Sequence, residues 1–215
     1  MNTHHPHLLV LAILAAPLAA GAYTGITDPV GDFLPTFAGE TSDIDLDVTS
    51  ATVLYDSSAD LFKLTATMAG ALPGDADHFY VWGVNRGAGT VNPDFASHGI
   101  DGVRFDRVVI LRQDGSGTVA GAGDLPTGAV KISGSTISAV VPGSFLASTG
   151  FNKIDYTWNV WPRDGEYVGF AQISDFAPDN ASFTTTVGVV PEPASLAMML
   201  LGLVSIGAVV RRRGA

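Results

Sequence analysis

Several short stretches between residues 24 and 187 alternate hydrophobic and polar side chains, which is the period of a β-strand with one buried face. The clearest is LFKLTATM, in which Phe62, Leu64, Ala66 and Met68 alternate with polar or charged residues. The same region shows no sustained helical period, and clusters of Gly, Pro, Asn, Asp and Ser interrupt it about every 8–15 residues. The pattern predicts a domain built from strands and short turns.

Further candidate strands follow from the same reasoning. The segment FYVWGVN is almost wholly apolar, which suits a central strand. The other segments are VRFDRVVILR, AVKISG, TISAVVPG, IDYTWNVWPR and EYVGFAQIS, with Asp164-Gly165 as a tight turn between the last two. About eight to ten strands with short loops favour an all-β, two-sheet sandwich over residues 23–188. Within it, TISAVVPGSFL resembles the edge passage of a jelly roll, where a proline ends a strand.

The segment DIDLDVTSATVLY predicts an acidic strand near the start of this domain. Its apolar residues at 44, 46 and 48 would face the core, while Asp43, Asp45 and Asp47 would share the opposite face. Like charges on one strand face repel one another unless a cation or solvent relieves them. Two interpretations stay open, a bound cation and a solvated outer face.

Calcium is the cation that this region favours. The turn Asp28-Pro29-Val30-Gly31-Asp32 can fold two carboxylates toward one point, and Asp43 and Asp45 follow on the adjoining strand. Calcium takes roughly six to eight oxygen ligands, so backbone carbonyls would have to complete the shell. The spacing matches no EF-hand loop. We therefore predict Asp28, Asp32, Asp43 and Asp45 as candidate calcium ligands.

The net charge of the domain limits the classes of molecule that it can bind. Residues 24–188 contain 8 Lys and Arg against 20 Asp and Glu, a net charge of −12. Such a surface repels nucleic-acid phosphates and anionic headgroups, which leaves cations, neutral glycans and basic proteins. The sequence has no cysteine, so disulfides, thiolate metal sites and a cysteine nucleophile are excluded.

The N-terminus carries the pattern of a secretory signal peptide over residues 1–22. The apolar run LLVLAILAA is too short to span a bilayer, and Ala20-Gly21-Ala22 offers the small-x-small pattern that signal peptidase accepts. We predict cleavage after Ala22. The segment MNTHHPH before the run lacks Lys and Arg, so a buried N-terminal helix of a cytosolic protein is the alternative.

The C-terminus combines an apolar run with a basic end. Residues 194–210 contain no charged side chain and would span about 26 Å as a helix, slightly less than a hydrocarbon core of about 30 Å. Arg211, Arg212 and Arg213 can reach the interface with their long side chains and would stay on the cytoplasmic side. We predict a transmembrane helix over residues 194–210 that holds the preceding chain outside.

Pro191-Glu192-Pro193, the apolar run and the terminal arginines together resemble the PEP-CTERM sorting signal over residues 189–215. The resemblance implies recognition by an exosortase, a membrane-bound peptidase that removes the helix near the Pro-Glu-Pro. It also implies export and a cell-surface or extracellular location after processing, often in bacteria that make extracellular polysaccharide. The same tail is sometimes labelled an ice-binding protein C-terminal domain, and we infer no ice binding from that label.

The start of the domain carries a second resemblance. TDPVGDF, followed by SDIDLDVTSATVLYDSSADLFKLTATMAG, is similar to the opening of family 9 carbohydrate-binding modules and their calcium-binding relatives. Those modules are jelly-roll sandwiches of exported bacterial proteins. The resemblance covers residues 27–70 and bears on the fold more than on the function.

Aromatic residues beside the predicted strands could stack on sugar rings. Pairs such as Tyr80 and Trp82 share a strand face, however, and are expected in the core. Trp161 lies where the alternation ends, next to Pro162, and is expected to be exposed. We name Trp161 and Tyr167 as candidate glycan-binding residues.

Patterns for catalysis are weak. His78 and His98 are the only histidines after the predicted signal peptide and lack a zinc-ligand spacing, and no nucleophile elbow or phosphate loop occurs. We expect a non-enzymatic, exported surface or matrix protein that binds extracellular polysaccharide or calcium. The alternatives are a secreted polysaccharide hydrolase, which needs an acid pair or histidine site in an open cleft, and a purely structural matrix protein.

Overall fold

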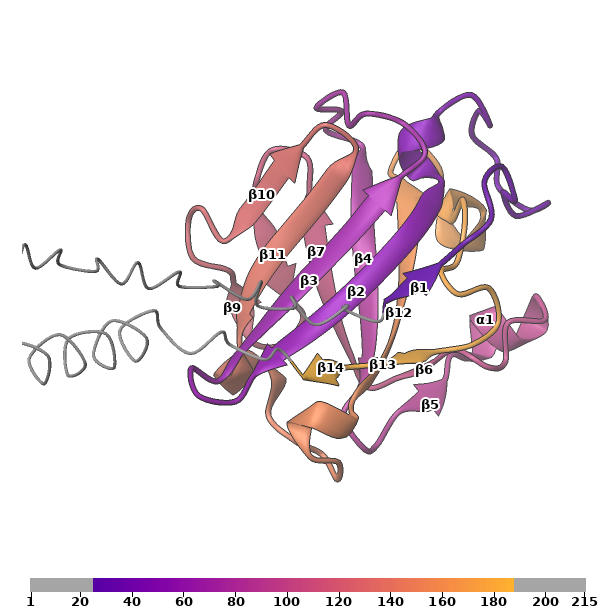
Figure 1. Ribbon diagram of the computed structural model, residues 1–215. Coiled ribbons are helices and arrows are strands. Elements are labelled where there is room, and N and C mark those ends of the chain that lie inside the picture. The colour runs from indigo at the N-terminus through magenta and orange to yellow at the C-terminus, as the bar shows by residue number, and fades with distance from the viewer. Residues whose placement is uncertain (1–24, 188–215) are drawn as a thin grey trace, which may run out of the picture.

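A computed structural model describes residues 25–187, which form two β-sheets packed face to face (Figure 1). This part of the chain contains very little helix, and the helical elements are α1 (Pro93–Ser97), η1 (Ile44–Leu46), η2 (Gly143–Leu146), η3 (Lys153–Asp155) and η4 (Gly169–Gln172). The alternating pattern explains the architecture, because a sheet with one buried face needs an apolar side chain at every second position. The predicted all-β, two-sheet fold is confirmed for these residues, and the jelly-roll connectivity stays a prediction.

The first sheet is built around three long antiparallel strands with short strands at its edges. Its members, in spatial order, are β1 (Ile26–Thr27), β2 (Val48–Asp56), β3 (Leu61–Met68), β11 (Thr136–Pro142) and β10 (Val130–Ser133). A further strand, β14 (Thr186–Val187), pairs in parallel with β2. Because β1 and β14 both pair with β2, the first and last described strands meet at the same strand (Figure 1).

The second sheet is antiparallel and lies behind the first in Figure 1. Its members, in spatial order, are β13 (Phe183–Thr184), β12 (Thr157–Asp164), β4 (His78–Asn85), β7 (Arg107–Arg112), β8 (Gly117–Val119) and β9 (Gly123–Asp124). A separate two-stranded ribbon joins β5 (Thr90–Val91) to β6 (Arg104–Phe105).

The main core lies between the two sheets. From the first sheet, β3 contributes Phe62, Leu64, Ala66 and Met68, which are all buried as predicted. The central strands of the second sheet add large side chains, namely Tyr80, Trp82, Val84, Val109, Leu111, Trp158 and Val160. Removal of this apolar surface from water is the main force that holds the sheets together.

The second sheet is also covered on its outer face. A second cluster there surrounds Trp161 with Phe95 from α1, Phe170 from η4 and Phe176 from the following loop. With both faces buried, β4 has no water-facing side to keep polar. This double burial explains why the segment FYVWGVN is apolar at nearly every position.

Two predicted strand segments adopt other structure. Residues 44–46 form η1, a 3₁₀ turn in which the Leu46 N–H donates to the Asp43 carbonyl at 2.8 Å. Ile44 is 47% exposed in this turn. Residues 169–172 form η4, where Gly169 has a φ of 65°, a left-handed conformation that ends an extended strand. The predictions of a strand starting at Asp43 and of a strand over EYVGFAQIS are therefore wrong.

The predicted signal peptide with Ala20 and Ala22, and the predicted transmembrane helix over residues 194–210, lie outside the described residues. Within residues 25–187, no helix is long and apolar enough to cross a membrane.

Candidate calcium site

Asp28 and Asp32 stand at the two ends of the turn that follows β1. The pairing of β1 with β2 continues through the Asp28 N–H, which donates to the Thr49 carbonyl at 3.0 Å. Gly31 has a φ of 82°, which glycine adopts without strain, and its N–H donates to Asp47 Oδ2 at 2.7 Å. The turn thus carries both carboxylates to the start of β2. An oxygen of Asp28 and an oxygen of Asp32 lie within 4.8 Å of each other, so the predicted convergence of the two carboxylates is confirmed.

Two aspartates from other parts of the chain join them. Asp175, which follows η4, is 1% exposed, and one of its carboxylate oxygens lies within 4.8 Å of an oxygen of Asp28 and of Asp32. Asp47 is equally buried and touches the turn through the hydrogen bond just described. Asp175 Oδ2 accepts the Val48 N–H at 3.0 Å, which places the carboxylate beside the start of β2. We call Asp28, Asp32, Asp47 and Asp175 the aspartate cluster.

Every member of the aspartate cluster has one buried oxygen without a hydrogen-bond partner among residues 25–187, namely Asp28 Oδ2, Asp32 Oδ1, Asp47 Oδ1 and Asp175 Oδ1. Buried polar atoms in folded proteins nearly always have partners, and an unmet one costs about 1–3 kcal/mol. In the same part of the chain, no lysine or arginine forms an ion pair with these carboxylates. One cation at the centre would satisfy several of these oxygens at once.

The environment of the cluster opposes ionisation. Burial raises the pKa of Asp175 to about 8, and the charges of Asp28 and Asp32 add to this effect. Burial also raises the pKa of Asp28 to about 7, with further contributions from Asp32, Asp179 and Asp47. The pKa values of Asp32 and Asp47 are raised as well, mainly by burial. Neighbouring buried carboxylates favour their charged form only when an opposite charge is close.

The set of donor atoms fits calcium. Calcium binds carboxylate oxygens at about 2.3–2.6 Å, so ligands on opposite sides of the ion lie about 5 Å apart. The oxygens of Asp28, Asp32 and Asp175 lie within 4.8 Å of one another, which is close enough for all three to bind one ion of this size. Backbone carbonyls, water or bidentate carboxylates would supply the rest of the roughly six to eight ligands. The cluster contains no histidine or cysteine, which are the usual ligands of structural zinc.

Asp45 lies apart from the aspartate cluster, and the prediction that it shares a site with Asp28 and Asp32 is wrong. Asp43 as a calcium ligand stays a prediction. Asp45 Oδ2 bonds His78 Nδ1 and Gln113 Nε2, each at 2.8 Å, inside the protein. The physical reason is η1, because a 3₁₀ turn rotates successive side chains by about 120° instead of the 180° of a strand. Residues 43, 45 and 47 therefore do not share one face.

The two candidate glycan-binding residues form no exposed platform. Trp161 is 1% exposed, so the prediction that it is exposed is wrong. Because β12 continues to Asp164, Trp161 points to the covered outer face of the second sheet and packs edge-on against Phe95, with ring centroids 5.3 Å apart. Tyr167 is half-buried and packs against Phe37 at a centroid distance of 6.5 Å. A sugar ring cannot stack on Trp161 in this arrangement.

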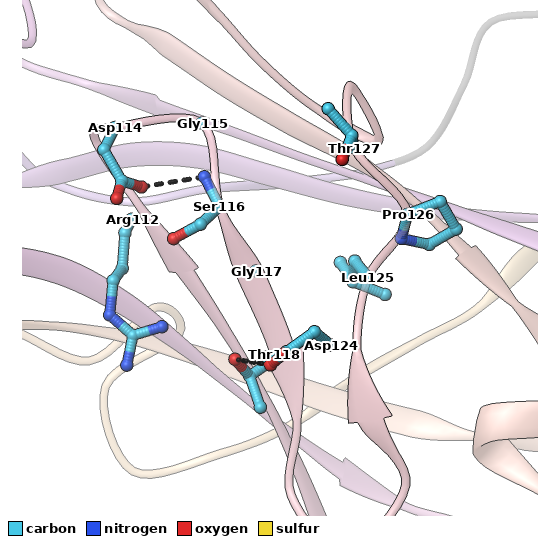
Figure 2. A pocket seen from close by; sticks show the side chains of 10 residues that line it. All are labelled: Arg112, Asp114, Gly115, Ser116, Gly117, Thr118, Asp124, Leu125, Pro126 and Thr127. Atoms are coloured by element: carbon cyan, nitrogen blue, oxygen red, sulfur yellow. Dashed lines mark hydrogen bonds between the residues drawn. The ribbon is translucent and has the colours of Figure 1, made fainter.

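A polar hollow of about 550 Å³ lies at the β9 edge of the second sheet (Figure 2). Thr118 Oγ1 donates to Asp124 Oδ1 at 3.0 Å, and the Ser116 N–H donates to Asp114 Oδ1 at 2.8 Å. The Arg112 guanidinium forms no hydrogen bond or ion pair with other residues of the described range. These groups can bond hydroxyls of a small polar ligand. Nothing in the pattern of the sequence pointed to this hollow.

Sequence reasoning missed Asp47 and Asp175 as members of the site. Asp47 belongs to the acidic run that begins at Asp43, but its inward direction depends on η1, which the alternation did not predict. Asp175 lies 127 residues after its hydrogen-bond partner Val48, and no local motif marks it. Only the meeting of distant segments reveals its role.

Comparison with protein families finds the PEP-CTERM protein-sorting motif at residues 189–213. The predicted sorting signal is confirmed, and the matched range includes Pro191-Glu192-Pro193 and the three terminal arginines. The motif marks an exported, surface-directed chain and implies an exosortase as its processing enzyme. No curated protein matches the chain.

Proposed function

We propose that this chain is an exosortase-processed protein of the cell surface or extracellular matrix whose β-sandwich binds calcium and catalyses no reaction. The sorting motif at residues 189–213 supports the destination. The net charge of −12 over residues 24–188 supports a cation as the partner. The observation that carries the calcium proposal is the aspartate cluster, in which each of four carboxylates keeps a buried oxygen unpartnered. Buried charges are stable when they are paired or coordinate a metal.

Two features of the described residues support a binding role over a catalytic one. His78 is bonded to Asp45 and only 7% exposed, so little of its ring can meet a substrate, and the exposed ring of His98 stacks on Phe170 at a centroid distance of 3.9 Å. In the hollow beside β9, hydrogen bonds from Ser116 lower the pKa of Asp114. A glycosidase acid needs the opposite shift, because it must hold its proton near neutral pH.

The calcium proposal is tested by titrating the full chain in detergent micelles with calcium chloride in a calorimeter. We expect binding with a Kd on the order of 10⁻⁴–10⁻³ M, the range of extracellular calcium modules. The double variant Asp28→Asn/Asp32→Asn should bind more than about tenfold more weakly, because it removes two charged ligands.

Glu40→Gln is the matched control for this titration. Glu40 is exposed and lies in the same segment of the chain, so its loss removes a negative charge without touching the cluster. The control should bind calcium as the wild type does. An absence of binding heat in the wild type up to about 10 mM calcium, well above the expected Kd range, would contradict the proposal.

A second candidate function is the binding of a neutral glycan in the hollow beside β9. The support is its lining, in which Arg112, Thr118 and Asp124 offer donors and acceptors for hydroxyl groups (Figure 2). The test is co-sedimentation of the full chain with extracellular polysaccharide of the producing bacterium. We expect Arg112→Ala/Asp124→Asn to reduce the bound fraction severalfold and the exposed control Arg104→Ala to leave it unchanged.

Each other result of that experiment points to one alternative. Release of reducing ends during the incubation would favour a secreted hydrolase. A complete lack of binding would exclude the glycan proposal for this polymer and would favour a purely structural matrix protein. Equal binding by the wild type and the double variant would show that the glycan binds outside the hollow.

A further inference from the structure

We propose that calcium fastens the N-terminal arm, residues 25–43, onto the sandwich, so that the fold is completed only where calcium is plentiful. The inference rests on the calcium site proposed above and concerns what ion binding does to the protein. The inference is based on where the members of the aspartate cluster lie, because two belong to the arm and two to the rest of the sandwich. Asp28 and Asp32 belong to the arm, whereas Asp47 and Asp175 belong to the rest of the sandwich.

Few backbone contacts hold the arm. β1 has two residues, and the chain then runs to η1 without further helix or strand (Figure 1). Beyond the Asp28 and Gly31 bonds already described, the Leu34 N–H donates to the Ser174 carbonyl at 2.7 Å and the Ala38 N–H to the Ala171 carbonyl at 3.0 Å. A segment with so few links opens more easily than a strand inside a sheet.

The apolar side chains of the arm are half-buried at most. Val30 is 71% exposed. Phe33 and Phe37 stack on each other, with centroids 5.8 Å apart. Ile26 and Leu34 are partly buried, Ile26 against the main core and Leu34 against the second cluster on the outer face of the second sheet. No side chain of the arm is fully buried, so hydrophobic burial holds the arm less firmly than it holds a strand of the core.

The carboxylates decide whether the arm docks. Without a cation, docking brings the two arm aspartates against the buried carboxylates of Asp47 and Asp175, and ionised carboxylates at this spacing repel one another. With calcium, Asp28, Asp32 and Asp175 become ligands of one ion, and attraction replaces repulsion. Ion binding and docking are then coupled, so that each favours the other.

The body side of the site reinforces this coupling. Ala171 and Ser174, which accept the two hydrogen bonds from the arm, lie in the same short segment as Asp175. Ser174 Oγ also donates to the Leu46 carbonyl at 2.7 Å, next to Asp47. An ion held by Asp175 therefore fixes the segment that the arm docks on.

Export takes the chain between two calcium regimes. Extracellular calcium modules bind at about 10⁻⁴–10⁻³ M, which is far weaker than the sites of cytosolic calcium buffers. A site of that affinity is empty in the cytoplasm and filled outside the cell. The sorting motif directs the chain outward, so the arm docks after export.

The test is hydrogen–deuterium exchange of the full chain in detergent micelles, in about 5 mM calcium chloride and in EDTA. Calcium binding is measured on the same preparation by calorimetry. We expect calcium to slow exchange in peptides that cover residues 25–43 by at least about tenfold, while peptides from β3 change much less. Asp32→Asn should lose this effect because it removes an arm ligand, and Glu40→Gln should keep it.

The outcomes separate this inference from the calcium proposal. If no calcium binds, the proposed function fails and the docking inference fails with it. If calcium binds but residues 25–43 exchange equally in both buffers, the site stands and the docking inference is overturned. Equal slowing over the whole sandwich would also overturn it, because the ion would then stabilise the fold without acting on the arm.

Discussion

The side chain of Asp175 performs two functions that conflict without a cation. Its Oδ2 accepts the Val48 N–H and so joins segments 127 residues apart. Its Oδ1 is buried without a partner among the described residues, and the carboxylate lies close to Asp28 and Asp32. The first contact favours the folded state, whereas the second penalises it through desolvation and repulsion. Replacement by asparagine separates the two, because an amide keeps the acceptor and loses the charge.

We predict that Asp175→Asn changes stability and calcium binding in opposite directions. In EDTA, the free energy of unfolding should rise by about 1 kcal/mol, because the new amide NH₂ can donate to oxygens that now lack partners. Calcium affinity should fall by about tenfold or more, because one charged ligand is lost. Urea unfolding in EDTA and calorimetric titration check the two halves, and a loss of stability in EDTA would contradict the first.

Asp45 illustrates a buried acid that already has partners. His78 is 7% exposed and Asp45 6%, and their 2.8 Å contact is supported by Gln113. The hydrogen bond to Asp45 raises the pKa of His78 above its ordinary value of 6.5. A raised histidine pKa contributes stability that is complete below about pH 6.5 and is lost as the pH rises through the raised value.

We predict that His78→Ala lowers the free energy of unfolding by about 2 kcal/mol at pH 6, because Asp45 keeps only part of its hydrogen bonding. The difference from wild type should shrink at pH 9, where the wild-type histidine has lost its proton. Urea unfolding at both pH values measures this. Calcium affinity at pH 7.5 should stay unchanged, and a large decrease would place Asp45 among the ligands after all.

At the scale of elements, the turn that follows β1 holds Asp28 and Asp32 in place, and Gly31 gives it its shape. Gly31 has a φ of 82° and Gly115, in the turn between β7 and β8, has a φ of 85°. An added Cβ would meet no atom within 4 Å at either position. The two glycines form a matched pair, since Gly31 lies between Asp28 and Asp32 of the aspartate cluster and Gly115 lies in a turn beside the hollow.

We predict that Gly31→Ala and Gly115→Ala each lower the free energy of unfolding by about 1 kcal/mol, the strain of a left-handed alanine. Only Gly31→Ala should also weaken calcium binding, by about fivefold, because the strained turn presents Asp28 and Asp32 less favourably. Parallel calorimetric titrations of the two variants measure this. Equal calcium affinities would show that the ion tolerates other shapes of the turn.

At the scale of the whole molecule, acidic residues far outnumber basic ones, and the aspartate cluster brings four of them together without a basic partner among the described residues. The pKa values of about 7 for Asp28 and about 8 for Asp175 lie well above the ordinary value of 3.8. At pH values between 3.8 and these raised pKa values, the two carboxyl groups hold protons in the metal-free folded state but release them in the unfolded state. Its stability is therefore greatest at low pH and falls as the pH rises through the folded pKa values.

We predict that raising the pH from 5 to 9 in EDTA lowers the free energy of unfolding by at least about 3 kcal/mol. In calcium the decrease should be smaller, because the ion replaces the protons that the carboxylates lose. The stabilisation by calcium should thus grow with pH, as urea unfolding at matched pH values will show. His78 affects both buffers equally, so a calcium effect independent of pH would argue against ligation by Asp28 and Asp175.

Features that depend on contiguous residues follow from the amino-acid sequence without the fold. The alternation of apolar and polar residues at every second position identifies β3 as a strand and shows which of its faces is buried. Alternation is a local property of an extended chain, so the sequence is enough to reveal it. The sorting signal at residues 189–213 is a continuous motif. The turn from Asp28 to Asp32 brings its own carboxylates together because one glycine permits it.

Tertiary structure alone decided which side chains meet across the sandwich. Trp161 is buried because α1 and the segment that follows β12 cover the outer face of the second sheet. Asp45 turns to His78 because η1 interrupts the strand that alternation predicted. Asp175 completes the aspartate cluster because the segment after η4 packs against the start of β2. These contacts depend on chain segments that no local period or motif relates, so only the assembled fold reveals them.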